Sequence, residues 1–208
     1  MTTEAASAAR SGLVLEAIVL AGGAGARFGG GKLIAPWRSG ALIDGALAAA
    51  LASPARGVIV VTGADPGVGP AASAFAARTG EAARLRIVHT DNHALGMAAT
   101  LRAGVRALLA AADGAFVFLG DMPLIPPAVL PRLADALAAG APAAAPVFAG
   151  RRGHPVLFAR PCFDALARLE GDEGARTVLQ SLGSALALID CADPGVLFDV
   201  DTPGDLAS

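Results

Sequence analysis

One segment constrains the fold of this chain more than any other. A hydrophobic run over residues 14–20 leads directly into a glycine-rich loop, residues 22–31, which ends at Lys32. The run is typical of a buried β-strand. Lys32 is the only lysine among 16 basic residues, so a compact ammonium is kept at this one position. A strand followed by glycines and cations predicts a cradle for phosphates, with a flexible surface turn as the alternative.

Short β-rich runs alternate with alanine-rich helical stretches along the rest of the chain. This pattern predicts an α/β fold, a Rossmann-like, mostly parallel sheet sandwiched by helices. The expected strands are residues 15–20, 57–62, 85–90, 115–119, 142–148, 155–159 and 196–200. The expected helices are residues 41–52, 71–79, 97–111, 161–169 and 173–182. Ligands of such sheets bind where the strands end, so residues directly after each strand are the first candidates for a site.

Length and composition limit the possible classes of protein. The 208 residues predict one domain over residues 13–208, preceded by a flexible tail over residues 1–12. No window reaches the roughly 20 uninterrupted apolar residues of a membrane-spanning helix. The net charge of −2, without a basic block, argues against a nucleic-acid partner. Cys162 and Cys191 have no metal or redox spacing, and we expect a cytoplasmic protein with reduced thiols.

Two common phosphate-binding motifs fit the glycine-rich loop poorly. A P-loop requires glycine where this chain has Ala26 and a hydroxyl where it has Leu33. The spacing of Gly23, Gly25 and Gly29 is closer to a dinucleotide fingerprint. That fingerprint also requires an acidic residue at the end of the next strand, and Asp65 lies beyond the expected position. Because the glycine spacing alone is close to this fingerprint, an NAD(P)-dependent oxidoreductase remains an alternative. In that case Lys32 would have no role.

A third loop pattern fits, and other segments support it. Residues 20–32 resemble the nucleotidyltransferase loop with its arginine and lysine, residues 119–123 (Leu-Gly-Asp-Met-Pro) resemble a G-D-x-P segment, and residues 198–206 resemble a D-x-D-T-P-x-D-L ending. Together these segments resemble the MobA-like nucleotidyltransferases of molybdenum-cofactor maturation, over nearly the whole chain. Residues 153–158 and 171–176 are similar to the cytidylyltransferase branch of that family. The resemblance implies a fold of the nucleotide-diphospho-sugar transferase type.

The resemblance implies transfer of CMP from CTP to molybdopterin, with release of pyrophosphate. A phosphate oxygen of molybdopterin would attack the α-phosphorus, so the protein supplies cations and positioning rather than a nucleophile. The implied catalytic residues are Arg27, Lys32 and Asp121. Asp121 and Asp201 would bind Mg²⁺, with Mn²⁺ as an alternative. Each of these aspartates could instead cap a turn or a helix, and Asp199 is expected to be structural.

Further residues would contact the two substrates. The implied nucleotide-binding residues are Leu20, Ala21, Gly22, Gly23, Gly25, Arg27, Lys32, Asn92, Gly96 and Thr100. The implied acceptor-binding residues are His154, Asp172 and Arg176. His93 is interpreted as a turn residue. A molybdoenzyme or its maturation chaperone is the implied partner.

The choice of nucleobase is left open by the loop. Gly22 stands where the CMP branch usually has alanine and the GMP branch glycine, whereas the C-terminal half resembles the CMP branch. A guanylyltransferase using GTP is therefore an alternative, as is a related transferase with another small phosphorylated acceptor. A non-catalytic cofactor carrier is a further alternative, which would bind ligand without releasing pyrophosphate.

Overall fold

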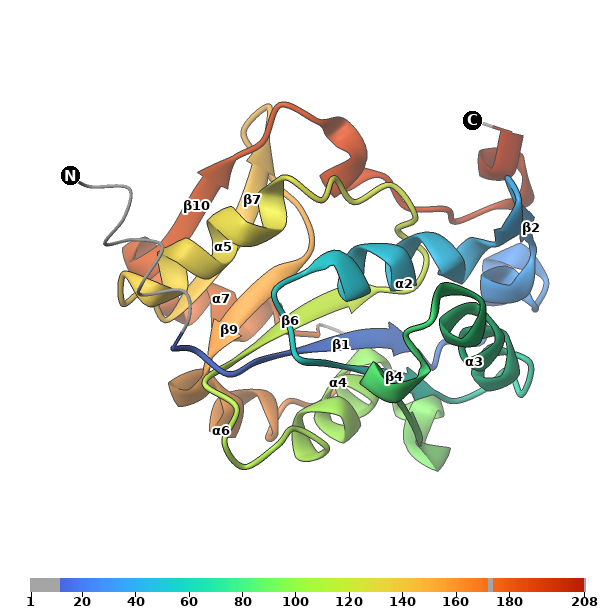
Figure 1. The fold of residues 1–208 in the computed structure, drawn as a ribbon, viewed down its shortest axis with the longest axis horizontal. Helices are drawn as coiled ribbons and strands as arrows, with labels where there is room; N and C mark the ends of the chain where they lie inside the picture. Colours follow the sequence, from blue (N-terminus) through green and yellow to red (C-terminus); the bar gives the residue numbers. More distant parts are fainter. Residues whose placement is uncertain (1–11, 172–173, 208) are drawn as a thin grey trace.

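The computed structural model describes residues 12–171 and 174–207, which form a mostly parallel β-sheet between two layers of helices (Figure 1). The α/β class predicted from the sequence is thereby confirmed. The strands of the sheet are β1 (Leu15–Ala21), β4 (Gly57–Thr62), β5 (Leu85–His89), β6 (Gly114–Leu119), β7 (Ala143–Phe148), β8 (Arg151–Arg152), β9 (Val156–Ala159) and β10 (Leu186–Asp190). Their order is β10-β7-β9-β6-β1-β4-β5, with β8 paired to β7. β9 runs antiparallel to both β6 and β7.

The helices divide between the two faces of the sheet. One face is covered by α2 (Leu42–Ala52), α3 (Val68–Thr79) and α5 (Val129–Ala138). The other face is covered by α4 (Met97–Arg106), α6 (Phe163–Leu166) and α7 (Arg176–Leu182). A separate two-stranded hairpin, β2 (Pro36–Trp37) and β3 (Gly40–Ala41), follows the glycine-rich loop. Within the described residues, no helix is long and apolar enough to cross a membrane.

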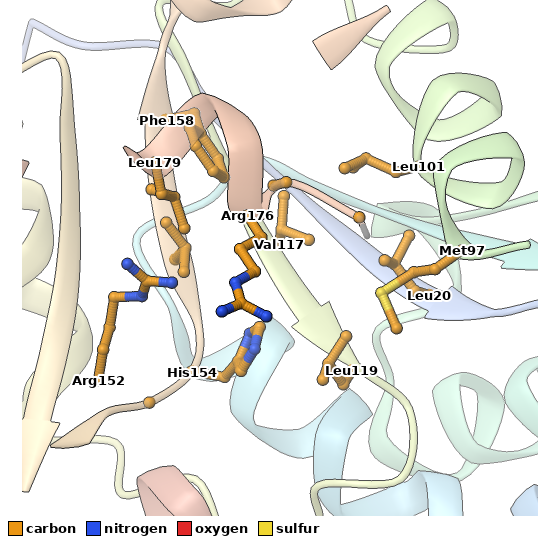
Figure 2. A pocket seen from close by; sticks show the side chains of 14 residues that line it. Leu20, Met97, Leu101, Val117, Leu119, Arg152, His154, Phe158, Arg176 and Leu179 are labelled. Carbon is orange, nitrogen blue, oxygen red and sulfur yellow. The ribbon is translucent and has the colours of Figure 1, made fainter. Parts of the chain in front are cut away.

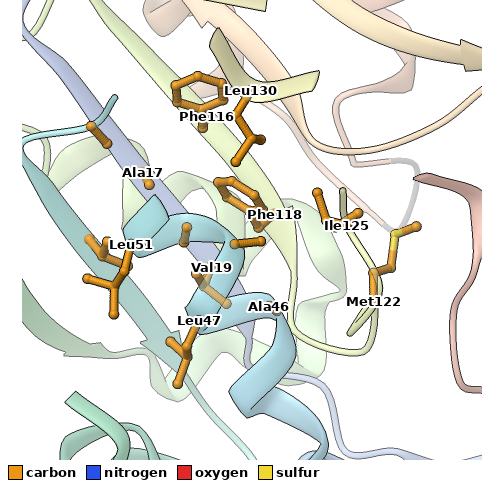
Figure 3. Packing of buried hydrophobic residues seen from close by; sticks show 14 of the residues in the cluster. Ala17, Val19, Ala46, Leu47, Leu51, Phe116, Phe118, Met122, Ile125 and Leu130 are labelled. Carbon is orange, nitrogen blue, oxygen red and sulfur yellow. The ribbon is translucent and has the colours of Figure 1, made fainter. Parts of the chain in front are cut away.

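The central strand β1 is buried along its whole length because alternate side chains enter two cores. Ala17 and Val19 belong to the cluster that includes Leu47 of α2 (Figure 3). Ile18, which is fully buried, belongs to the opposite cluster with Leu101 of α4. Each large aliphatic side chain buried in this way stabilises the fold by about 1.5–3 kcal/mol. The two cores hold β1 rigidly, and the end of β1 is where the glycine-rich loop begins.

The strand order of the sheet reverses at β1. From β1 the chain proceeds to β4 and β5 on one side, and then returns to place β6 on the other side. β1 and β6 are parallel neighbours, with Leu20 opposite Leu119. The loops that follow these two strands therefore diverge from the same edge of the sheet. In open α/β sheets this switch point is the usual position of a ligand site.

Most of the predicted strands are confirmed within one residue, but the strand predicted at residues 196–200 is wrong. Pro194–Leu197 is a 3-10 helix, and the edge strand is β10 instead. Pro194 fixes its own φ and lacks a backbone donor, which favours the first turn of a helix over a sheet ladder. The side chains of β10 are half-buried or exposed, as expected for a strand at the edge of a sheet. Its sequence therefore lacks the continuous apolar run of a central strand and resembles that of a loop.

The predicted helices are correct in position but several differ in length. The helix predicted over residues 97–111 ends at Arg106. The helix predicted over residues 161–169 is a 3-10 turn, Arg160–Cys162, followed by the single turn of α6. For the helix predicted over residues 173–182, α7 begins at Arg176, and residue 173 lies outside the described residues. α5 was not predicted, since its sequence starts soon after three prolines and lacks a side-chain cap.

Candidate active site

The glycine-rich loop follows β1 and turns back sharply on itself. Gly25 has a φ of 59° and accepts hydrogen bonds from the backbone N–H groups of Phe28 and Gly30. The consecutive residues 29–31 all have positive φ, between 64° and 94°, a conformation that side chains with a Cβ rarely adopt. The turn leaves Lys32 at the start of a 3-10 helix, Lys32–Ile34. The loop thereby places Lys32 close to the edge of the sheet at which β1 ends.

Lys32 meets the loop that follows β6. Its ammonium Nζ lies 2.6 Å from Oδ2 of Asp121 and 3.7 Å from Oδ1 of Asp201. The Lys32 side chain is only 13% exposed, whereas those of Asp121 and Asp201 are 25% and 42% exposed. Reduced access of water strengthens the attraction between these charges. The lysine therefore holds both carboxylates at the switch point of the sheet.

Asp201 reaches this position through the C-terminal segment. The backbone N–H of Val200 donates a hydrogen bond to the Asp121 carbonyl oxygen at 3.0 Å. Oδ2 of Asp205 accepts hydrogen bonds from the backbone N–H groups of Asp201 and Thr202 and from the Thr202 hydroxyl. These bonds lower the pKa of Asp205. Because Asp205 caps this turn, the Asp201 side chain is available to face the loop, where it accepts a 2.8 Å bond from the Arg27 guanidinium.

Asp199 adds a third carboxylate to the site. Its pKa is raised, first by burial and then by the negative charges of Asp201 and Asp121, while Lys32 opposes the shift. Sequence reasoning assigned Asp199 a structural role, yet it lines the same cleft as Asp121 and Asp201. The three carboxylates face two cations, Lys32 and Arg27. A net negative charge at this point favours binding of a further cation.

The donor set fits a hard divalent cation. Two carboxylates, Asp121 and Asp201, lie against one ammonium, and Mg²⁺ or Mn²⁺ commonly takes one or two protein carboxylates together with waters and phosphate oxygens. Within residues 12–171 and 174–207 there is no group of three or more His, Cys, Asp or Glu residues suited to hold a metal ion by itself. A metal here would depend on a phosphate ligand for part of its coordination.

An open cleft of about 930 Å³ lies over this cluster. Of the residues predicted to bind nucleotide or metal, those that line it are Leu20, Ala21, Gly22, Gly23, Gly25, Arg27, Lys32, Gly96, Thr100, Asp121 and Asp201. Asn92 is not among the lining residues. It lies in the exposed 3-10 turn Asp91–Leu95, whose first residues are capped by Thr90.

Two further polar residues of the cleft were not predicted to belong to the site. Asp65 follows β4, and its Oδ1 accepts a hydrogen bond from the Gly67 backbone N–H, while Oδ2 is buried and has no partner among the described residues. Nδ1 of His93 lies 3.1 Å from the Thr90 carbonyl oxygen, and His93 lines the cleft together with Met97. The position of Asp65 soon after a strand was the signal that could have identified it.

Gly22 and Thr100 are in close contact across the cleft wall. A Cβ atom built on Gly22 would lie 2.7 Å from Oγ1 and 3.1 Å from Cγ2 of Thr100. Thr100 itself is buried on α4. A methyl group at position 22 would therefore crowd the Thr100 side chain, which favours glycine there.

A second, smaller cavity of about 180 Å³ adjoins the cleft, and the two share Leu20, Met97 and Leu119 (Figure 2). His154 and Arg176, two of the predicted acceptor-binding residues, line it. Asp172, the third, lies outside the described residues. Burial lowers the pKa of His154 to about 4, against the opposing effects of a hydrogen bond with the Val117 backbone and of the Asp121 charge.

Comparison with known proteins places this geometry in a family. Residues 17–186 match the family model of the MobA-like NTP transferase domain. The chain is 25% identical to the molybdenum cofactor cytidylyltransferase of Escherichia coli K12 over 191 residues, covering 92% of this chain and 93% of the relative. It is 31% identical to the nicotine blue oxidoreductase of Paenarthrobacter nicotinovorans over 193 residues, covering 89% and 91%.

Solved structures agree with this assignment. The crystal structure of Rv0371c from Mycobacterium tuberculosis H37Rv is similar with a TM-score of 0.76 and 28% identity, covering 94% of this chain and 99% of that one. A second structure of that protein, in complex with manganese, has a TM-score of 0.70 and 25% identity over 94% and 96% of the two chains. The similarity extends over nearly the whole of both chains. The chain therefore belongs to the MobA-like NTP transferase family.

Proposed function

We propose that this protein transfers CMP from CTP to molybdopterin, with Mg²⁺ bound and pyrophosphate released. The observation that carries the proposal is the cluster of Lys32, Asp121, Asp201 and Arg27 at the switch point of the sheet, beneath a cleft lined by the glycine-rich loop. Cations and carboxylates in this arrangement suit phosphoryl chemistry, in which charge must be neutralised and held in line. Nothing in the reaction requires a nucleophile from the protein, because the acceptor phosphate is already ionised.

The residues of the cluster divide the work between them. Backbone N–H groups of residues 22–25 bind the triphosphate, and the exposed Arg27 reaches its outer oxygens. Lys32 stabilises the charge that builds up on the α-phosphate as the bond to pyrophosphate lengthens. Asp121 and Asp201 hold the divalent cation, which supplies further neutralisation of the phosphate oxygens when bound. The manganese complex of Rv0371c supports a divalent cation in this fold.

The choice of CTP rests on two observations. The Escherichia coli relative that matches over almost the whole chain is a cytidylyltransferase. Gly22, the residue that resembles the GMP branch, is explained by its contact with Thr100 and so need not indicate guanine. The product would pass to a molybdoenzyme or its maturation chaperone in the cytoplasm, an environment consistent with two free cysteines.

The experiment that tests the proposal is pyrophosphate release with Mg²⁺ and molybdopterin, comparing CTP, GTP and ATP. Release with CTP alone is the expected result. Release with GTP alone would keep the mechanism and overturn the nucleobase. No release with any nucleotide, under conditions where the Escherichia coli cytidylyltransferase is active, would overturn the proposed reaction.

A second candidate is an oxidoreductase, because the relative with 31% identity over 91% of its length is named for that activity. In that case the same cleft would bind a nicotinamide dinucleotide without a divalent cation. Oxidation of NADPH or NADH in the presence of a planar dye, unaffected by EDTA and retained in Lys32→Ala, would favour this candidate over nucleotide transfer.

A further inference from the structure

The large cleft crosses the ends of three neighbouring parallel strands, β6, β1 and β4. Lys32 and Asp121 lie at the ends of β1 and β6, whereas Asp65 and His93 line the part of the cleft beyond β4. Neighbouring strands are about 4.8 Å apart, so the ends of β6 and β4 are separated by roughly 10 Å, a distance that a nucleoside can span. The smaller cavity lies on the other side of β6, next to β9. With the α-phosphate at Lys32, the β4 side of the cleft is therefore the side left for the base.

His93 is held firmly against the end of β4. A Cβ atom built on Gly63, the residue after β4, would lie 2.6 Å from His93 Cβ and 2.6 Å from the Gly22 carbonyl oxygen. The backbone N–H of Thr90 donates a hydrogen bond to the carbonyl oxygen of Thr62, the last residue of β4, at 3.0 Å. Nδ1 of His93 in turn lies 3.1 Å from the Thr90 carbonyl oxygen. These contacts fix the histidine relative to β1 and β4.

The contact with Thr90 determines which nitrogen of the His93 ring carries the proton. A carbonyl oxygen only accepts hydrogen bonds, so Nδ1 donates, and the neutral ring leaves Nε2 as an acceptor. Nε2 has no partner among the described residues and is not one of their buried unpaired atoms, so solvent reaches it. His93 therefore offers an accessible acceptor, and no donor, in the cleft that it lines.

The other polar side chains on this side of the cleft lack this property. Oδ1 of Asp65 accepts a hydrogen bond from the Gly67 backbone N–H, and Oδ2 is buried. Thr100 packs against Gly22, and a hydroxyl both donates and accepts, so it does not distinguish an amino group from a keto group. Among the described residues of this side, His93 is thus the one whose side chain can make that distinction.

We infer that His93 is a specificity-determining residue, which accepts a hydrogen bond from the 4-amino group of cytosine and thereby selects CTP over UTP. Cytosine has an amino donor at this position, whereas a 4-keto pyrimidine has an acceptor oxygen. The keto oxygen would meet the lone pair of Nε2 with no proton between them, and both atoms would lose their hydrogen bonds to water. The inference rests on the proposed function, to which it adds a residue and a chemical reason for the choice of pyrimidine.

Three nucleotides that differ at C4 of the base test the inference on the unmodified full chain. CTP carries an amino group there, UTP a keto oxygen, and the triphosphate of 2-pyrimidinone riboside only hydrogen. Calorimetric titration with Mg²⁺, and without an acceptor so that no transfer occurs, should show CTP binding roughly tenfold tighter than the 2-pyrimidinone nucleotide, the effect of one hydrogen bond. UTP should bind no better than the 2-pyrimidinone nucleotide. Equal affinities of CTP and the 2-pyrimidinone nucleotide would overturn the inference.

Variants then assign the preference to the histidine. His93→Phe keeps a flat ring without an acceptor, and it should lower the affinity for CTP to that for the 2-pyrimidinone nucleotide. His93→Gln presents both a donor and an acceptor, so CTP and UTP should bind with similar affinity. His89→Phe is the matched control, since His89 is exposed and does not line the cleft, and it should keep the wild-type preference. A preference for CTP that persists in His93→Phe, or that is lost equally in His89→Phe, would overturn the role of His93.

The binding test is separable from the proposed reaction. Binding selective for CTP and dependent on His93, without pyrophosphate release in the presence of molybdopterin, would support the inference and reject the transfer activity. Pyrophosphate release with CTP and molybdopterin, together with equal binding of the three nucleotides, would support the transfer activity and reject His93 as the residue that selects the base.

Discussion

The ammonium of Lys32 lies 2.6 Å from Oδ2 of Asp121, although 89 residues separate the two in the sequence. This contact joins the loop after β1 to the loop after β6, the two loops that meet at the switch point. We predict that Lys32→Ala lowers the rate of pyrophosphate release at least about a hundredfold, the usual effect of losing one charge-stabilising group. Lys32→Arg should restore little, since a planar guanidinium cannot replace a compact ammonium between two carboxylates.

The control for Lys32 is Arg106→Ala, which removes an exposed charge at the end of α4, remote from the cleft lining. Turnover should remain near the wild-type rate in that variant. Thermal unfolding of all three proteins checks that each is folded. Near-wild-type turnover of a folded Lys32→Ala protein would show that the lysine is not catalytic.

The contact between Gly22 and Thr100 predicts a coupled pair. In Gly22→Ala the new methyl group would lie 2.7 Å from Thr100 Oγ1, and we expect a loss of about 1–3 kcal/mol in the free energy of unfolding. Adding Thr100→Ser should recover most of this loss, because serine has a single γ atom that can rotate away. A double-mutant cycle by urea unfolding measures the coupling, and additive effects would contradict the contact.

The buried central strands and the loops that carry charge could be predicted from the sequence. Residues 57–62 form a strand with the predicted bounds, since a short β-branched run is typical of a central parallel strand buried on both faces. Lys32 and Asp121 follow parallel strands, so their meeting at one edge of the sheet was also predictable. These features depend on local pattern and on general rules of topology.

The remaining features depend on tertiary contacts that leave no local pattern. β10 is an edge strand whose ladder is provided by β7, and its sequence alone resembles a loop. Asp201 faces Lys32 because Asp205 caps the turn and Val200 bonds to Asp121, and a motif does not reveal the bond between Val200 and Asp121. The Asn92 side chain was assigned to the nucleotide from a resemblance, yet Asn92 does not line the cleft.

The ionised Asp199 side chain lowers the stability of the folded protein at neutral pH when no metal cation is bound. Its raised pKa means that the folded protein holds a proton more tightly than the unfolded chain does, so stability falls as the pH rises above the ordinary value of 3.8. Asp199→Asn should therefore raise the free energy of unfolding at pH 7.5, by less than about 1 kcal/mol because the residue is exposed and water screens its charge.

The difference between the Asp199→Asn and wild-type proteins should shrink as the pH falls toward 3.8, because Asp199 of the wild type then takes up a proton and loses its charge. Saturating Mg²⁺ should also reduce it, by offsetting the repulsion from Asp121 and Asp201. Urea unfolding at about pH 4.5 and 7.5, with and without MgCl₂, measures both effects. A variant less stable than wild type at the higher pH would contradict the prediction.

His154 predicts a loss of stability in mild acid. Its pKa is about 4 in the folded protein and 6.5 when the ring is fully solvated, so between these values the unfolded chain takes up a proton that the folded protein does not. The free energy of unfolding should fall as the pH drops through 6.5 toward 4, by a total of about 3 kcal/mol from this group.

The variant His154→Phe tests this prediction, as long as it folds at neutral pH. Its free energy of unfolding should lack the part of the decrease between pH 6.5 and 4 that comes from His154. His89→Gln is the matched control, because the His89 side chain is 57% exposed and the substitution also removes one histidine. Urea unfolding at about pH 7, 6 and 5 compares the three proteins, and equal slopes in the wild type and His154→Phe would show that this histidine is not held neutral by burial.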